Sequence, residues 1–545
     1  MTRSASLWAP VATLVIAFST ASALWADGLR VGTADTMVKV PRDGVGPLGV
    51  EAAAAIRWGD ALRVELARGE SESAQLVIAA APGKPLHGVR VTVGRLVRQT
   101  AGGDVPWPAG DLSVWRVGFV EAVNLWEPHE NLGWLPDPLL PLDAPFDVSA
   151  GTSQPVWLRF RATEGMTAGL YRGEVTVEAP GEPPVRVPIR AELWDFTLPR
   201  TQHFTLSIPT WGGQWEAMYP GTMTPQRRRE FLDFLIAYRV SPFPLTDLVE
   251  MPYCFSQGQR AFCLNCFPVD YVPDDTTKKM RGLAEMWQKQ PFAAEATPYV
   301  LLGDEAPPKF YPNIKEQGRL VRAAAPMVKR QFTISPETAT QGFDFAMKEL
   351  AGAGDIAILG AANCYHTHED TTRIRAAGLG LWWYYVASHY YIPERGLEAR
   401  QIFWRHWKYQ IPGQLHWGVS YWGDTNIAGR DGKKWPEIPW DTRSSRTGDG
   451  YLVYPATGGT GVWPSIRLEQ LRDGVEDYEY FHLLAELTQI REAASSASDP
   501  TVGANRRLLA IDDTLVKAYK EYDPHPEAYR GYRRRLARAI MATQR

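Results

Sequence analysis

The sequence has little excess charge, few cysteines and no long apolar run beyond its first residues. Lysine and arginine number 58 against 61 aspartates and glutamates, which gives a formal net charge of −3 over 545 residues. A balance this close to neutral does not indicate a nucleic acid or a strongly acidic partner. After the N-terminus, no segment is long and apolar enough to span a bilayer. We therefore expect no nucleic-acid partner and no stable membrane span.

The N-terminus has the pattern of an export signal. Arg3 supplies a positive charge, residues 7–18 are mostly apolar, and Ala21-Ser22-Ala23 offers a small-residue cleavage site with Ala26 as a later option. An uncleaved anchor is the alternative. We assign residues 1–26 to a signal peptide and expect a secreted or periplasmic protein.

The cysteines are too few for a disulfide-dense scaffold. The sequence contains four, Cys254, Cys263, Cys266 and Cys364. Export permits disulfides, and we favour one or two of them. The alternatives are buried free thiols, or a zinc site built from the C-x-x-C pair and the run Cys-Tyr-His-Thr-His at 364–368.

The chain divides into segments of different periodicity. Residues 27–198 contain short alternating runs such as "LRVELARG" and "VRVPIRAELW", separated by glycine, proline and aspartate. This pattern predicts a β-sandwich. Residues 199–490 alternate strands with amphipathic helices, and residues 491–545 are helical and charged. The predicted fold class is therefore an N-terminal β-sandwich, a TIM-like (β/α)8 barrel and a C-terminal helical extension.

The barrel assignment depends on counting strands. Apolar runs suited to buried parallel strands fall at 203–209, 240–245, near 267–272, 298–303, 331–335, 355–360, 379–386 and 414–422. A doubly wound open sheet also fits the alternation, but no glycine-rich phosphate loop follows the first strand. We therefore prefer the barrel.

Two adjacent carboxylates follow one of these strands. The apolar run at 299–302 stops at Gly303, then come Asp304 and Glu305, and two prolines at 307–308. Barrel enzymes carry their chemistry at the carboxyl ends of the strands. Neighbouring side chains face one site only where a strand gives way to a loop, as glycine and proline permit here. The alternative is a helix cap or a solvated loop pair.

Adjacency limits what two carboxylates can do. Most glycosidases need two carboxyl groups about 5 Å or more apart, one of them a nucleophile or base. Neighbours suit the task better when the substrate brings its own nucleophile. In substrate-assisted cleavage a 2-acetamido oxygen attacks C1, one carboxylate orients the amide, and the other acts as acid and base.

Several motifs resemble glycoside hydrolase family 123, whose catalytic segment is covered by domain-of-unknown-function family 4091. They are "DFTLP", "GDE", "WWYY", "GQLHWGVSYW", "GDGYLVYP" and "SIRLEQLRDGVEDYEY". The resemblance implies a retaining, substrate-assisted exo-β-N-acetylgalactosaminidase, with Asp304 orienting the acetamide and Glu305 as general acid/base. One departure is Ala306, which precedes Pro307 where the family often has proline directly after the acids.

Aromatic residues at strand ends are candidates for sugar contacts. Periodicity places one Trp–Tyr pair of "WWYY" inward, and the resemblance favours Trp382 and Tyr384. The candidate substrate-binding residues are Trp382, Tyr384, Trp417, Trp422, Trp211, Tyr365 and Glu337. Core packing is the alternative for each aromatic residue. His366 and His368 could bind metal, contact substrate or cap the next helix, and we favour the last; we interpret the charged run "RLEQLRDGVEDYEY" as structural.

We expect a carbohydrate substrate, a glycan or a glycolipid, and neither a cofactor nor a metal. Two other functions stay open: a glycosidase of another specificity on the same scaffold, and a non-catalytic carbohydrate-binding envelope protein. The retained acid pair argues against the second.

Overall fold

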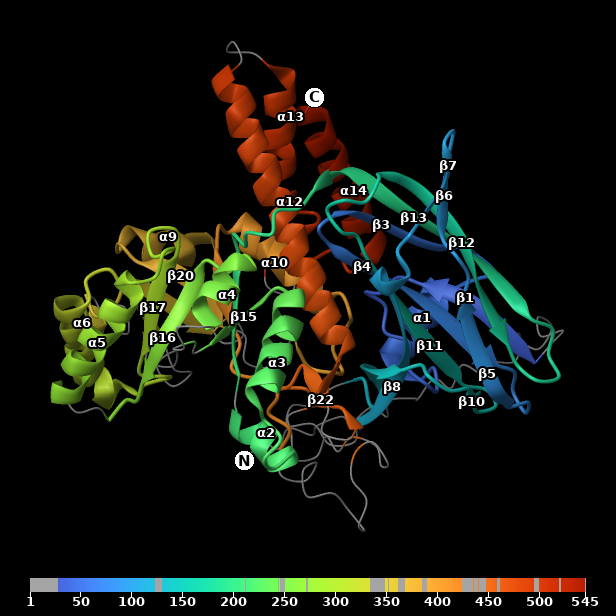
Figure 1. The fold of residues 1–545 in the computed structure, drawn as a ribbon, viewed down its shortest axis with the longest axis horizontal. Helices are drawn as coiled ribbons and strands as arrows, with labels where there is room; N and C mark the ends of the chain where they lie inside the picture. The colour runs from blue at the N-terminus through green and yellow to red at the C-terminus, as the bar shows by residue number, and fades with distance from the viewer. Residues whose placement is uncertain are drawn as a thin grey trace, which may run out of the picture.

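The molecule has a β-sandwich on one side and a helix-covered barrel on the other, with a long helix, α12 (Ile466–Ala494), between them (Figure 1). The computed structural model describes residues 28–122, 130–210, 212–243, 245, 250–270, 273–333, 348–350, 352–360, 368–384, 390–423, 435, 440, 447–457, 461–494, 499–518 and 521–544. The predicted class, a sandwich followed by a (β/α)8 barrel with C-terminal helices, is confirmed.

In the described residues the sandwich is built from thirteen strands, some of which alternate buried and exposed side chains while others are buried on both faces. They are β1 (Leu29–Ala34), β2 (Arg57–Trp58), β3 (Leu62–Arg68), β4 (Ser71–Ala80), β5 (Leu86–Val93), β6 (Val97–Thr100), β7 (Gly103–Pro106), β8 (Leu112–Ala122), β9 (Gly133–Pro141), β10 (Phe146–Val148), β11 (Ser153–Arg161), β12 (Gly169–Glu178) and β13 (Val185–Thr197). One sheet has the order β2-β1-β4-β11-β8-β9. The other runs β10-β5-β12-β13-β3, and the β6–β7 hairpin joins it at β12.

One helix interrupts this part of the chain, where the sequence predicted only strands. Helix α1 (Gly46–Ala55) has Leu48 and Ala52 buried. Its second half is rich in alanine, the strongest helix former, and this local propensity outweighs the strand pattern around it.

The barrel sheet contains eight parallel strands. They are β14 (Thr205–Pro209), β15 (Val240–Phe243), β16 (Ala261–Phe267), β17 (Thr297–Leu302), β18 (Lys329–Thr333), β19 (Ile356–Gly360), β20 (Gly380–Tyr384) and β21 (Gly413–Leu415). β14 pairs with β21, so the first and last strands meet. Among the described residues β15 and β16 are neighbours without ladder hydrogen bonds, so the barrel is nearly closed.

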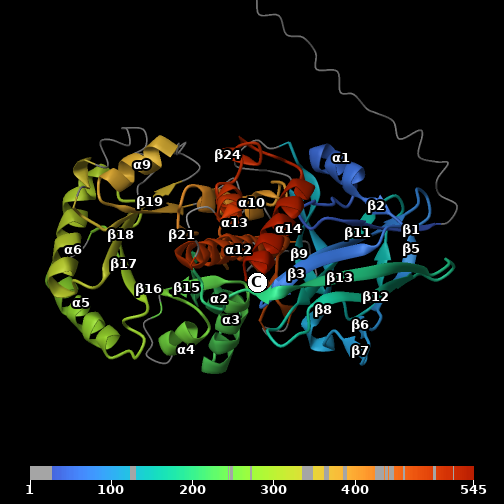
Figure 2. The same ribbon diagram turned by 90° about the horizontal axis from the view of Figure 1, so that it is seen from above.

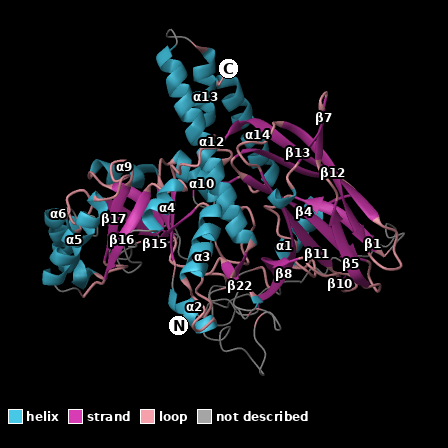
Figure 3. Ribbon diagram, viewed as in Figure 1, coloured by secondary structure: helices cyan, strands magenta, loops and turns pink. Residues whose placement is uncertain are grey.

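Helices cover the outside of the barrel, as the view from above shows (Figure 2). They are α2 (Gly212–Met218), α3 (Pro225–Ala237), α4 (Glu250–Ser256), α5 (Pro273–Gln288), α6 (Tyr311–Ala324), α9 (His368–Ala376) and α10 (Glu398–Lys408). A hairpin of β22 (Val453–Pro455) and β23 (Val462–Pro464) precedes α12. Helices α13 (Pro500–Leu509) and α14 (Pro526–Thr543) pack beside the far end of α12 (Figure 3), and the short strands β24 (Val516–Ala518) and β25 (Glu521–Tyr522) lie between them in sequence. No helix in the described ranges is both long and apolar enough to cross a membrane.

The third barrel strand corrects the prediction of a strand near 267–272. The strand is β16, which carries Cys263 and Cys266. The preferred prediction of disulfides is also wrong for the described cysteines, because Cys254, Cys263 and Cys266 are free thiols. The Sγ atoms of Cys263 and Cys266 are 4.0 Å apart, about twice the length of a disulfide bond. Burial raises the pKa of Cys254 to about 12. Cys364 and His366 lie outside the described residues.

The charged run in α12 is structural, as predicted, and its ion pairs reach further than expected. Arg467 forms a two-pronged pair with Asp137 of β9, at 2.9 and 2.8 Å. Arg400 of α10 binds Asp477 of α12 at 2.7 Å and Glu72 of β4 at 3.0 Å. All five side chains are buried. The helix therefore joins the sandwich to the barrel through buried ion pairs.

Candidate functional site

The acid pair lies where β17 ends, and the backbone there leaves the regular strand conformation. Gly303 has φ of +50° and Glu305 has φ of +44°. A positive φ is uncommon for a residue with a side chain. It breaks the strand alternation, so that Asp304 and Glu305 can serve one site. A Cβ atom on Gly303 would lie 2.2 Å from Cδ1 of Ile314, so glycine is required here.

Thr333 links the two acids. It is the last residue of β18, the strand that pairs with β17. Its hydroxyl donates to Oδ1 of Asp304 at 3.1 Å and accepts from the backbone N–H of Glu305 at 2.5 Å. One side chain therefore fixes the carboxylate of the first acid and the backbone of the second. The sequence analysis missed Thr333, and its place at the end of the strand next to β17 was the available signal.

Tyr384, the last residue of β20, contacts the acid pair from across the barrel. Its hydroxyl hydrogen-bonds the Glu305 carboxylate. Burial raises the pKa of Tyr384 well above its ordinary value, and the negative charges of Asp304, Glu305 and Asp449 raise it further. The phenol therefore stays protonated and acts as a hydrogen-bond donor.

Asp304 is reached by solvent but surrounded by protein. Its side chain is exposed at the strand end, yet burial raises its pKa, and the Thr333 hydrogen bond opposes this with a smaller effect. No ion pair to Asp304 occurs in the described part of the chain. Such an acid holds its proton to higher pH than a free aspartate does.

Trp382 and Tyr384 lie on the inner face of the barrel, where the resemblance placed them. They belong to a small core with Tyr299 and Leu415, whereas Trp383 packs outward in the larger core shared with the helices. The Trp382 ring lies edge-on to Tyr299 with centroids 5.4 Å apart. Trp382 is enclosed by these neighbours, so it supports the site from below.

Trp417 and Asp449 form a hydrogen-bonded pair close to Tyr384. The indole N–H of Trp417 donates to Oδ1 of Asp449 at 2.6 Å. The ring is half-buried and its centroid lies 5.1 Å from that of Tyr421, which is 42% exposed. Asp449 is buried and its charge acts on Tyr384, so these groups form one cluster. Sequence analysis missed Asp449, although it stands in the motif "GDGYLVYP".

The structure corrects one predicted substrate contact and leaves three outside its described ranges. Trp422 has no exposed surface, and its N–H donates to the carbonyl of Val453 at 2.9 Å. It belongs to the core and offers no face to a sugar. Trp211, Tyr365 and Glu337 lie outside the described residues.

One group of potential metal ligands occurs in the described ranges, and it lies away from the acids. His203, just before β14, has its Nδ1 2.7 Å from Oε2 of Glu479, and its ring stacks on His482 at 3.6 Å with an interplanar angle of 8°. Two parallel rings at this spacing cannot both hold one ion in their planes, as imidazole coordination requires. The group is better described as a histidine–glutamate pair at the opposite end of the barrel.

Comparisons with known proteins agree with this geometry. Residues 297–484 match the family described as glycoside hydrolase 123, catalytic domain. No curated protein sequence matches the chain. A solved family 123 glycoside hydrolase from Clostridium perfringens, described in terms of glycolipid glycan hydrolysis, has a TM-score of 0.66 at 12% identity. The match covers 94% of this chain and 98% of that one.

A β-D-glucuronidase from Dictyoglomus thermophilum matches with a TM-score of 0.32 at 8% identity, over 72% of this chain and 97% of that one. That likeness is too low to support an argument. The segment matched by the family contains Asp304, Glu305, Tyr384, Trp417 and Asp449. Residues 297–484 therefore carry the catalytic domain of glycoside hydrolase family 123, on a fold shared with a solved member of that family.

Proposed function

We propose that the protein removes terminal β-linked N-acetylgalactosamine by a retaining mechanism in which the substrate's own acetamide is the nucleophile. The observation that supports this best is the bridge from Thr333 to both members of the acid pair. Two acids held as chain neighbours leave the enzyme without a separate nucleophile across the sugar ring. A 2-acetamido group supplies that nucleophile.

In the first step the acetamide carbonyl oxygen attacks C1 and the bond from C1 to the leaving oxygen breaks. Glu305 donates its proton to that oxygen, and the product is a cyclic oxazolinium ion. Asp304 accepts a hydrogen bond from the acetamide N–H and stabilises the positive charge. In the second step Glu305 takes a proton from water, which attacks C1 and reopens the ring with net retention.

Tyr384 and Trp417 position the reactants. The Tyr384 hydroxyl, kept protonated, donates to Glu305 and orients that carboxyl group. Trp417 is fixed by its bond to Asp449, and its half-buried ring beside Tyr421 offers an apolar face for the sugar's C–H groups. The candidate residues Trp211, Tyr365 and Glu337 remain proposed contacts of the same site.

We further propose that the substrate is a glycan carried by a glycolipid and that the protein is secreted or periplasmic. The Clostridium perfringens relative, described in terms of glycolipid glycan hydrolysis, supports the first point. The export pattern at residues 1–26 supports the second.

The test compares aryl β-glycosides of N-acetylgalactosamine, N-acetylglucosamine and galactose on the wild type, Asp304→Asn and Glu305→Gln. We expect the N-acetylgalactosaminide alone to turn over rapidly, and each variant to lose about 10²–10⁴-fold in kcat/KM. Glu285→Gln, at an exposed position on α5, is the matched control and should retain full activity. Equal turnover of the plain galactoside would exclude substrate assistance.

A better leaving group separates the two roles. With a 2,4-dinitrophenyl glycoside the leaving oxygen needs no proton, so Glu305→Gln should lose much less in the first step than with a poor leaving group. Asp304→Asn should lose activity with both substrates, because the amide still has to be oriented. Equal losses for Glu305→Gln on both substrates would contradict its assignment as the acid.

A further inference from the structure

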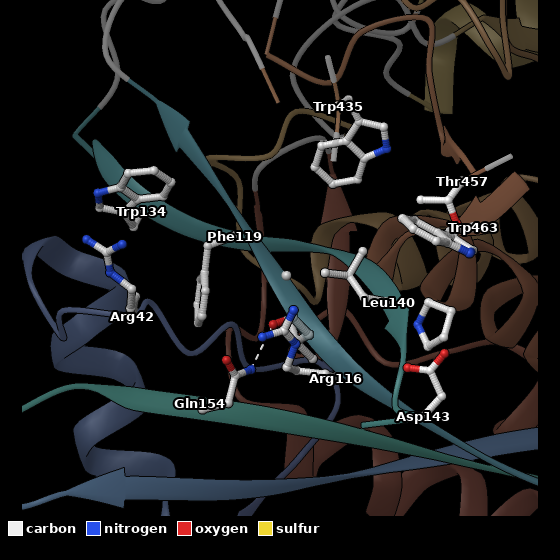
Figure 4. A pocket seen from close by; sticks show the side chains of 13 residues that line it. Arg42, Arg116, Phe119, Trp134, Leu140, Asp143, Gln154, Trp435, Thr457 and Trp463 are labelled. Atoms are coloured by element: carbon white, nitrogen blue, oxygen red, sulfur yellow. Dashed lines mark hydrogen bonds between the residues drawn. The ribbon is translucent and has the colours of Figure 1, made fainter. Parts of the chain in front are cut away.

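A groove of about 640 Å³ lies where the sandwich meets the hairpin that follows the barrel (Figure 4). Arg116 and Phe119 of β8 and Trp134 of β9 line one part of it. Trp435 and Trp463, which come from the region after the last barrel strand, line the other. This volume is within the range of small-molecule binding sites. None of these residues belongs to the catalytic cluster described above.

The walls of the groove are aromatic and held in place. Figure 4 shows Trp134 and Phe119 on one side and Trp435 and Trp463 on the other. Trp435 donates its N–H to the carbonyl of Pro455 at 2.8 Å and meets Trp463 edge-on, with centroids 6.1 Å apart. Flat, fixed aromatic faces bind the C–H side of sugar rings, because the electron-rich ring face attracts their weakly positive hydrogens.

Two arginines line the groove, and they differ in whether a carboxylate pairs with them. Arg42 binds both carboxylate oxygens of Asp43, at 2.9 and 3.1 Å, and lies over the Trp134 ring at 4.2 Å. Arg116 is half-buried and its guanidinium lies over the Phe146 ring at 5.9 Å, but within the described residues it forms no hydrogen bond or ion pair. Burial lowers the pKa of Arg116 and the charge of Asp143 opposes this, although the two side chains form no ion pair.

A partly buried guanidinium is stabilised when a carboxylate accepts two parallel hydrogen bonds from its N–H groups. We propose that this groove is a second glycan-binding site, which takes a sugar bearing a carboxylate. The sugar ring stacks between the aromatic walls, and its carboxylate binds Arg116. This site is separate from the acid pair, and its existence does not depend on the proposed hydrolysis.

The test measures binding to the full chain carrying Glu305→Gln, so that turnover cannot interfere. Methyl β-glucuronide and methyl β-glucoside are the first probes, because they differ only in having a carboxylate or a CH2OH group at C6. Sialyllactose and lactose are the second pair, which distinguishes a sialic acid from a uronic acid as the carboxylate source. Ligand-observed NMR titration gives the four dissociation constants.

We expect at least one acidic sugar to bind about tenfold more tightly than its neutral partner. Adding Arg116→Gln should remove that preference, Arg116→Lys should restore part of it, and Arg190→Gln, at an exposed position on β13, should leave it intact. Trp463→Ala should weaken the acidic and neutral sugars alike.

Three results would overturn the proposal: equal binding of acidic and neutral sugars, a preference that survives Arg116→Gln, or no binding of any probe. If Arg116→Gln fails to fold, the salt dependence of sugar binding by the Glu305→Gln chain tests the proposal instead. The acid preference should shrink as ionic strength rises, because it depends on one charge pair. A preference that does not change with salt would count against Arg116.

Discussion

Two regions of the molecule that contain several acids differ in the partners of those acids. In α12 the acids are paired with arginines: Asp477 binds Arg400 and Arg533 at 2.7 and 2.9 Å. At the end of β17, by contrast, Asp304 has the neutral Thr333 as its hydrogen-bond partner. The α12 acids lie in the junction between sandwich and barrel, whereas Asp304 lies at the open end of the barrel.

The pKa shifts of Glu469 and Asp304 reflect this difference, although burial still raises the pKa of Asp473 and of Glu476 in the same helix. Burial raises the pKa of Glu469 in α12, but Arg472 and Arg159 outweigh it and hold the pKa below its ordinary value. For Asp304 burial prevails, because the Thr333 hydrogen bond offsets only part of it. Glu469, neutralised by arginine, therefore serves the junction, whereas Asp304, left beside a neutral partner, is available for chemistry.

The largest effect is expected from breaking the paired region. Arg467→Met removes the two-pronged partner of Asp137 and leaves that carboxylate buried, with Tyr454 as its donor at 2.5 Å among the described residues and the Lys39 charge nearby. Stability should fall by about 3–5 kcal/mol, the usual cost of an uncompensated buried charge. Denaturant unfolding measures it, with Arg190→Met on an exposed strand position as control. A loss in stability below about 1 kcal/mol would mean that the Arg467–Asp137 ion pair does not hold α12 to the sandwich.

Gly303→Ala should disturb the acid pair directly. The added Cβ meets Cδ1 of Ile314 at 2.2 Å, and alanine is strained at φ of +50°. We expect a loss of about 1–3 kcal/mol in stability and a larger proportional loss of activity, because the acids move. Adding Ile314→Ala should recover part of the activity by removing the clash. No recovery would assign the whole loss to backbone strain.

Thr333→Val keeps the shape of the side chain and removes its hydroxyl. Asp304 must be ionised to stabilise the cation, so activity rises as pH passes its pKa. Without the hydrogen bond that lowers that pKa, the acid limb of the kcat/KM profile should move to higher pH. The maximum should fall about tenfold. Thr333→Ser, which retains the hydroxyl, should keep the wild-type limb, and an unmoved limb in Thr333→Val would refute the linkage.

The smallest effect concerns stability. The pKa of Asp304 is raised on folding, so the folded state binds more protons, and stability falls as pH rises from the ordinary aspartate pKa of about 3.9 through the folded value. Asp304→Asn removes this cost while its amide oxygen still accepts from Thr333. The variant should melt slightly above the wild type at neutral pH and equally near pH 3. A lower melting temperature at pH 7 would contradict the raised pKa.

Apolar periodicity predicted most of the barrel, because buried parallel strands are continuous hydrophobic runs. β16 was predicted at the wrong place, because its sequence mixes cysteine and asparagine and its register shifts between Cys263 and Asn265. The alternation of "WWYY" predicted that one Trp–Tyr pair faces inward, and the family resemblance was needed to choose Trp382 and Tyr384.

The partners of the site could not be predicted in the same way. Thr333 and Asp449 lie on different elements from the acids: the pairing of β18 with β17 brings Thr333 to them, and the tertiary fold brings Asp449 near Tyr384. Trp422 and Trp417 are similar in sequence context, yet one is buried and the other half-exposed. Burial depth depends on the packing of β22 and β23, which local pattern does not report.

The most direct test of the central claim varies the nucleophile itself. Aryl β-glycosides carrying N-acetyl, N-fluoroacetyl, N-difluoroacetyl and N-trifluoroacetyl groups differ in the electron density on the carbonyl oxygen. If that oxygen attacks C1, kcat should fall steeply with each added fluorine. A kcat that stays level across the series would contradict this attack, because the nucleophile would then belong to the protein or to water.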